Sequence, residues 1–93
     1  MDPADLLEPG GVSIGDEGSQ PSIREVPGGI RAAEDLFSQL TDGATPAPRP
    51  NYPGDCYGLP GGGWAGYRPV SKSGSPVIDI DIPGVSIKKI HFL

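Results

Sequence analysis

The sequence predicts an α+β fold in which one main helix precedes a four-stranded antiparallel β-sheet. Two observations predict it. One segment near the middle has apolar residues at helical spacing, and four later segments alternate like strands between turns rich in Gly, Pro and Ser. With 15 glycines and 12 prolines among 93 residues, part of the chain is expected to lack packed structure. A chain of this length forms one small domain with a thin margin of stability.

Residues 1–22 are expected to form a flexible, acidic N-terminal segment that is disordered or loosely packed. They mix Asp, Glu, Gly, Ser and Pro with scattered leucines, and they show neither helical nor strand periodicity over a useful length. One helical turn at residues 2–8 is the only local structure they suggest, since Pro9-Gly10-Gly11 would stop it. The folded domain is therefore expected to span residues 23–93.

The main helix is predicted at residues 30–41, where apolar residues recur on one helix face. That face comprises Ile30, Ala33, Leu36, Phe37 and Leu40. Acidic residues lie early in the segment, where the helix dipole favours them, and Gly43 follows as a stop. Residues 44–54 are dense in proline, so they are expected to be an extended connection rather than a helix or a central strand.

Four strands are predicted at residues 55–59, 64–70, 77–82 and 87–92. The turns between them are a Pro-Gly-Gly-Gly reversal, a polar loop at 71–76, and a Pro-Gly pair typical of a type II turn. Because each connection is short, we expect an antiparallel meander packed against the helix.

Strand alternation predicts which side chains share the sheet face that the helix leaves uncovered. The isoleucines of the third strand must face the core, so the two aspartates between them face outward. The same parity turns Tyr67 inward. If Pro83-Gly84 centres the last hairpin, the aspartates lie across from the basic residues of the last strand, where a carboxylate would orient an imidazole. The outer face is therefore expected to bear Arg68, Asp79, Asp81, Lys89 and His91.

This set of side chains suits acid and base chemistry on a phosphodiester. Imidazole and carboxylate groups exchange protons near neutral pH, while guanidinium and ammonium groups neutralise phosphate oxygens. We assign candidate catalytic roles, for attack of an RNA 2'-hydroxyl on the neighbouring phosphate without a metal, to Arg68, Asp79, Lys89 and His91. An alternative stays open, because alternating acids and bases on a water-facing sheet are also ordinary solubilising pairs.

Candidate substrate-binding residues come from the polar loop and its surroundings. Hydroxyls, a lysine and backbone donors in a glycine-containing turn can hold a phosphate, although a merely hydrated loop has the same composition. Aromatic side chains can stack on bases, or can belong to the core of so small a domain. The candidates are Ser71, Lys72, Ser73, Lys88 and Trp64.

The charge distribution leaves room for a nucleic-acid substrate. The net charge is -5, but residues 1–43 hold nine acidic and two basic side chains, whereas residues 44–93 hold three and five. A local basic cluster can dock phosphate at short range even on an acidic protein.

Several other chemistries find no support in the sequence. The single cysteine, Cys56, cannot form an internal disulfide and is expected to be a buried thiol rather than a nucleophile. No Cys/His array predicts a metal site, and residues 61–63 lack the pattern of a nucleotide-binding loop, so no cofactor is expected. No apolar run approaches the roughly 20 residues of a membrane helix, so no membrane partner is expected.

A series of short motifs runs in order through the second half of the chain: Tyr52-Pro-Gly54, Leu59-Pro-Gly-Gly-Gly63, Gly66-Tyr-Arg68, Ser73-Gly-Ser-Pro76, Ile78-Asp79, Ile82-Pro-Gly84 and Lys88-Lys-Ile-His-Phe92. This ordered series resembles the C-terminal toxin domains of bacterial polymorphic toxins of the contact-dependent inhibition and Rhs types. The resemblance covers about residues 22–93. In that family lysine often stands where this chain has His91, which favours Arg68 and Asp79 as site residues.

The resemblance implies a domain that is secreted as the C-terminal part of a larger effector and delivered into the cytoplasm of a target bacterium. A cognate immunity protein would protect the producer. Many such domains are metal-independent ribonucleases, and the predicted fold is similar to the barnase, EndoU, colicin and RelE group. We therefore expect an antibacterial endoribonuclease, with transfer RNA as one candidate substrate. The alternatives are a non-catalytic protein-interaction module and a toxin that acts on DNA or another target.

Overall fold

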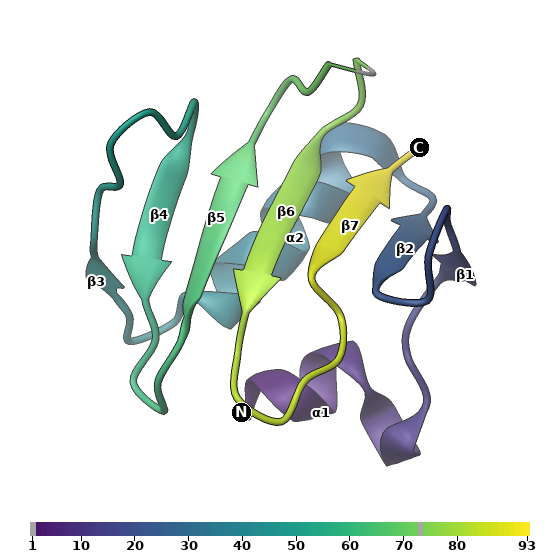
Figure 1. Ribbon diagram of the computed structural model, residues 1–93, viewed down its shortest axis with the longest axis horizontal. Helices are drawn as coiled ribbons and strands as arrows, with labels where there is room; N and C mark the ends of the chain where they lie inside the picture. Colours follow the sequence, from purple (N-terminus) through teal and green to yellow (C-terminus); the bar gives the residue numbers. More distant parts are fainter. Residues whose placement is uncertain (1, 73) are drawn as a thin grey trace.

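The computed structural model describes residues 2–72 and 74–93. The fold is α+β, with helix α2 (Gly29–Leu40) packed on one face of a sheet and the short helix α1 (Pro3–Leu7) below one end of it (Figure 1). The sheet has seven strands in the order β1-β2-β7-β6-β5-β4-β3. The expected four-stranded antiparallel sheet is therefore wrong, because further strands extend it at both edges.

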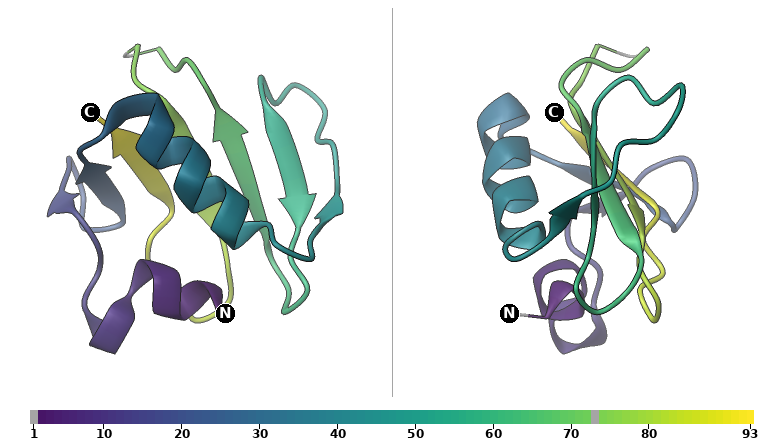
Figure 2. Two further views of the ribbon diagram at one scale, coloured as in Figure 1. Left: turned by 180° about the vertical axis from the view of Figure 1, so that it is seen from behind. Right: turned by 90° about the vertical axis from the view of Figure 1, so that its left-hand side faces the viewer.

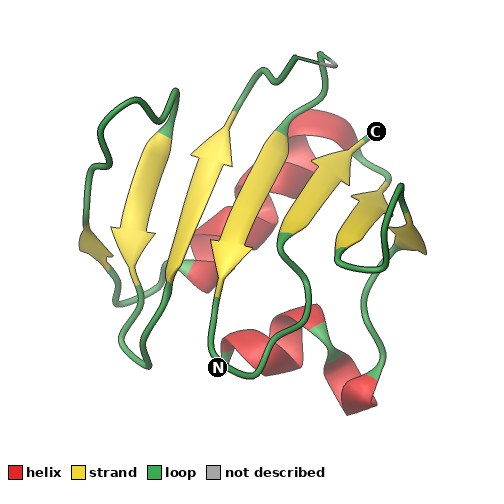
Figure 3. Cartoon of the chain, viewed as in Figure 1, coloured by secondary structure: helices red, strands yellow, loops and turns green. Residues whose placement is uncertain are grey.

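The four predicted strands form the centre and one side of this sheet (Figure 3). They are β4 (Asp55–Gly58), β5 (Trp64–Arg68), β6 (Val77–Asp81) and β7 (Lys89–Phe92), and they pair antiparallel in chain order. The last hairpin is centred near Pro83-Gly84 as expected, since the Cα of Asp79 pairs with that of Lys89. Strand parity therefore holds within β4 to β7, but Ile87, which belonged to the predicted last strand, lies before β7 and is buried in the core rather than turned outward with Lys89.

Three strands were not predicted. The edge strands β1 (Asp16–Glu17) and β3 (Thr45–Pro46) have two residues each, too few for a periodic signal. A proline is acceptable in β3 because an edge strand leaves one row of backbone groups unpaired. The third strand, β2 (Ile23–Val26), pairs parallel with β7 and so makes the sheet mixed. This pairing joins two segments that are more than 60 positions apart in the sequence. The local pattern of residues 23–26 does not predict it.

The core lies between α2 and the sheet. Helix α2 confirms the predicted segment to within one residue, and Ala33, Phe37 and Leu40 are buried against inward-facing strand residues. Ile30, assigned to the same apolar face, is instead 52% exposed. Tyr67 points inward as predicted, with its ring centroid 5.5 Å from that of Phe37. The helix covers only one face of the sheet, as the edge-on view shows (Figure 2).

The expectation of a disordered or loosely packed N-terminal tail is also wrong. The Asp2 carboxylate accepts a hydrogen bond from the Ala4 amide and caps α1. Helix α1 leads into a 3-10 turn, η1 (Pro9–Gly11), and Leu7 is fully buried in the core. Arg24 of β2 donates hydrogen bonds to the carbonyls of Ile14 and Gly15. A single leucine produces no periodicity, yet it closes the end of the core that α2 leaves open.

Leu7→Ala tests whether the N-terminal segment belongs to the folded unit. Because Leu7 is fully buried, the substitution should lower the free energy of unfolding by about 2–5 kcal/mol. Val12→Ala is the control, since Val12 is 71% exposed and should change stability by no more than about 0.5 kcal/mol. Urea denaturation measures both. Equal, small effects would show that α1 does not contribute to the core.

Glu8, at the C-terminal end of α1, is hydrogen-bonded to the connection between β6 and β7. This contact predicts that the stability of the fold depends on pH. Its carboxylate accepts hydrogen bonds from the hydroxyls of Ser86 at 2.5 Å and Ser13 at 3.2 Å. The bond from Ser86 lowers the pKa of Glu8 below its ordinary value of 4.5. A carboxyl with a lowered pKa in the folded state stabilises the protein above the unfolded value, and this contribution disappears as pH falls through the folded value.

Glu8→Gln should therefore destabilise the protein at pH 7, and the difference from the unaltered chain should shrink as the pH falls below about 4.5. Glu17→Gln, at an exposed position of β1, is the matched control. Thermal unfolding between pH 3 and pH 7 measures the effect. A stability difference that does not change with pH would contradict the assignment.

Candidate functional site

The sheet face opposite α2 carries the residues that strand parity assigned to it. The register places His91 of β7 beside Val77 of β6, and Val77 beside Arg68 of β5. One row below, Lys89 lies beside Asp79. A shallow cavity of about 190 Å³ on this face is lined by Arg68, Ser71, Lys72, Lys89 and His91. We call this the cationic pocket.

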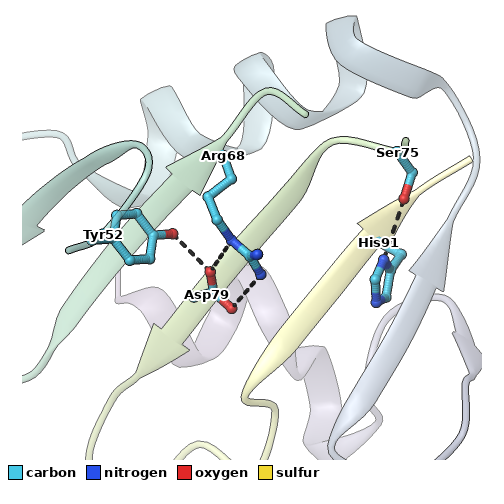
Figure 4. A network of polar contacts seen from close by, with 5 residues as sticks. All are labelled: Tyr52, Arg68, Ser75, Asp79 and His91. Atoms are coloured by element: carbon cyan, nitrogen blue, oxygen red, sulfur yellow. Dashed lines mark hydrogen bonds and ion pairs between the residues drawn. The ribbon is translucent and has the colours of Figure 1, made fainter. Parts of the chain in front are cut away.

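Arg68 is fixed in place by Asp79. Its Nε donates to one carboxylate oxygen of Asp79 at 2.8 Å, and a terminal nitrogen donates to the other at 3.2 Å (Figure 4). The two side chains are only 19% and 15% exposed. Burial alone would lower the pKa of Arg68, but the hydrogen bonds and charge of Asp79 outweigh it and raise that pKa. The guanidinium is therefore charged and held in one orientation.

Tyr52, on the loop before β4, completes this cluster. Its hydroxyl donates to Asp79 at 2.7 Å, and burial together with this bond raises the pKa of the phenol above its usual range. The ring lies over Gly66 of β5, where an added Cβ would come within 2.6 Å of the Tyr52 hydroxyl. Sequence reasoning missed this role of Tyr52. A glycine inside a strand was the available signal, since it marks a close approach.

Asp79, assigned a catalytic role from the sequence, is occupied by these contacts. It accepts hydrogen bonds from both Arg68 and Tyr52. Both of its oxygens are therefore engaged within the cluster. Its geometry suits the positioning of Arg68 rather than proton transfer.

His91 lies in a different environment from the expected one. The aspartates of β6 do not flank it, because its register partner on that strand is Val77, and Asp81 instead pairs with Lys88 at 3.5 Å. Its Nδ1 lies 3.3 Å from the Ser75 hydroxyl (Figure 4). The carboxylate on the adjoining strand is Glu25 of β2. Sequence reasoning missed Glu25, because β2 was not predicted.

The candidate substrate-binding residues divide into three groups. Ser71 and Lys72 line the cationic pocket, and Ser73 lies outside the described residues. Lys88 and Trp64 do not line it. Trp64 instead lies 4.2 Å beneath the guanidinium carbon of Arg49, and Lys88 is exposed beside Asp81.

Cys56 is buried as predicted, only 4% exposed. Burial raises the pKa of its thiol, which disfavours the reactive thiolate. Among residues 2–72 and 74–93, no three His, Cys, Asp or Glu side chains gather closely enough to hold a metal ion. Within the same residues, no helix has the length and apolar character needed to cross a bilayer.

No protein-family model matches this chain, and comparisons with curated proteins and with solved structures also find no match.

Tyr52→Phe and Gly66→Ala test the cluster that holds Arg68. Tyr52→Phe removes one hydrogen bond to a partly buried carboxylate and should cost about 1–2 kcal/mol of unfolding free energy. Gly66→Ala should displace the Tyr52 ring, since the new methyl group would collide with it. Because both changes break the same contact, the double variant should be less destabilised than the sum of the single variants. Urea denaturation measures the cycle, and strict additivity would contradict the contact.

Proposed function

We propose that this protein is an endoribonuclease that cleaves RNA without a metal ion, as a toxin domain acting on a target bacterium. One observation carries the proposal. Three cationic side chains and an imidazole line one cavity on the uncovered sheet face: Arg68, Lys72, Lys89 and His91. A phosphodiester is an anion whose cleavage needs charge neutralisation and proton transfer, and these groups supply both.

The supporting geometry is most specific at Arg68. Asp79 takes the Nε–H and one terminal N–H of its guanidinium, so the remaining terminal N–H groups are left for phosphate oxygens. Asp79 and Tyr52 hold it before any substrate binds, so little ordering is required when charge develops on the phosphate. Lys72 and Lys89 add positive charge from a loop and from β7.

His91 is the proton-transferring group of the proposal. The contact of its Nδ1 with Ser75 orients the ring and leaves Nε2 for a substrate. In this role the imidazole protonates the departing 5'-oxygen or takes a proton from the 2'-hydroxyl.

The setting of the activity follows from the motif resemblance and forms part of the same proposal. The domain would reach the target cytoplasm as the C-terminal part of a larger effector, and a cognate immunity protein would block the cationic pocket. Transfer RNA is the first substrate to test.

RNA cleavage by the purified protein in EDTA is the direct test. The unaltered chain should degrade bulk RNA, and His91→Ala should slow cleavage by about 10²–10⁴-fold. Arg68→Ala should slow it by about 10²–10³-fold, because it removes a fixed charge at the phosphate. Arg31→Ala is the control, since Arg31 lies exposed on α2, and it should leave cleavage unchanged.

Thermal unfolding of each variant separates loss of activity from loss of fold. Intact RNA after incubation with a stoichiometric amount of the unaltered chain would reject the ribonuclease and favour a non-catalytic interaction module. Cleavage of DNA in place of RNA would favour the DNA-directed alternative.

A further inference from the structure

A row of side chains crosses the uncovered sheet face from an acidic edge to the cationic pocket. The register aligns Asp16 of β1 with Glu25 of β2, and Glu25 with His91 of β7. Residues paired in this way project to the same face, and neighbouring strands lie about 4.8 Å apart. Glu25 is therefore the carboxylate that adjoins His91.

Glu25 and His91 also share a cavity. A second hollow of about 330 Å³ is lined by Glu25, Ser75, His91 and Leu93. His91 lines both this hollow and the cationic pocket, because β7 lies between β2 on one side and β6 on the other. The imidazole thus lies between the hollow that contains Glu25 and the cationic pocket.

The proposed cleavage needs two proton-transferring groups, one that takes a proton from the 2'-hydroxyl and one that gives a proton to the 5'-oxygen. His91 can serve as only one of them at a time. Asp79 is held by Arg68 and Tyr52, and Asp81 pairs with Lys88. Within residues 2–72 and 74–93, the half-buried Glu25 carboxylate is engaged by no hydrogen bond or ion pair. Unlike Asp79, Glu25 does not hold another side chain in position.

We propose that Glu25 is the catalytic base of the reaction and that His91 is its acid. The inference rests on the proposed ribonuclease function. The ribose that carries the attacking 2'-hydroxyl occupies the hollow beside Glu25, and the scissile phosphate occupies the cationic pocket. This placement fixes the direction of the RNA across the sheet, with the attacking nucleotide toward β2 and the departing nucleotide toward β5.

The step balances without any further reactant. The Glu25 carboxylate takes the proton of the 2'-hydroxyl, the bond between the 2'-oxygen and phosphorus forms, and the bond between phosphorus and the 5'-oxygen breaks. The departing 5'-oxygen takes a proton from the His91 imidazolium. The products are one fragment that ends in a 2',3'-cyclic phosphate and one that begins with a 5'-hydroxyl.

Kinetics across pH separate a base from a residue that merely contributes charge. A base must be ionised and an acid must be protonated, so the unaltered chain should show a bell-shaped dependence of kcat/KM on pH. The other charged groups that face the pair from neighbouring strands and the loop are Asp16, Arg68, Lys72, Asp79 and Lys89. The Glu25 variants keep all of these charged groups, so a change in the pH dependence reports on Glu25 itself.

The test uses the full chain and a labelled single-stranded RNA oligonucleotide. Glu25→Gln should lower kcat/KM by about 10²–10⁴-fold and should remove the fall in rate at acidic pH. Glu25→Asp keeps a carboxylate, so it should keep that acidic fall at a reduced rate, even if Glu25→Gln proves unstable. Asp16→Asn removes the same charge one strand away and should change kcat/KM by less than about threefold, because β2 separates β1 from β7, which carries His91.

The outcomes discriminate between the two proposals. Cleavage by the unaltered chain, with an acidic fall that persists in Glu25→Gln, would overturn the role of Glu25 and leave the ribonuclease standing. Equal losses in Asp16→Asn and Glu25→Gln would overturn it as well, since they would indicate a general effect of charge. No cleavage by the unaltered chain would overturn both proposals. Fragments that end in a 2',3'-cyclic phosphate support the attack by the 2'-hydroxyl.

Discussion

The central position of β7 is the constraint on which the rest of the structure depends. This strand pairs antiparallel with β6 and parallel with β2, so the last residues of the chain are hydrogen-bonded on both sides. The Leu93 amide even donates to the Val26 carbonyl at 2.8 Å. Alternation along β7 buries Ile90 and Phe92 beneath α2 and turns Lys89 and His91 to the other face. The same strand thus closes the core and presents the cations of the candidate site.

The uncovered face also shows how a small domain holds charges that are partly buried. Removal of an ion pair from water is costly unless its remaining hydrogen-bonding capacity is satisfied. Arg68 and Asp79 meet this condition through two mutual hydrogen bonds and a third from Tyr52. Gly66 leaves the space that the Tyr52 hydroxyl occupies, so a residue without a side chain permits the third of these hydrogen bonds.

The two cavities that His91 lines differ in charge, and this difference sets the orientation proposed for the RNA. Cations gather on the side of β5 and the polar loop, and a carboxylate stands on the side of β2. A reaction that neutralises a phosphate while it moves two protons needs this kind of asymmetry.

The sequence by itself determined the parts that depend on local periodicity. The main helix, the four strands of the meander, the inward direction of Tyr67 and the outward direction of Arg68, Lys89 and His91 all follow from the spacing of apolar residues and from strand parity. Tertiary structure alone decided the rest: the parallel pairing of β2 with β7, the burial of Leu7, the role of Tyr52 and the position of Glu25 beside His91. The physical reason is distance along the chain. Periodicity reports which face of one element is buried, whereas contacts between remote segments depend on how the whole chain fills the space around its core.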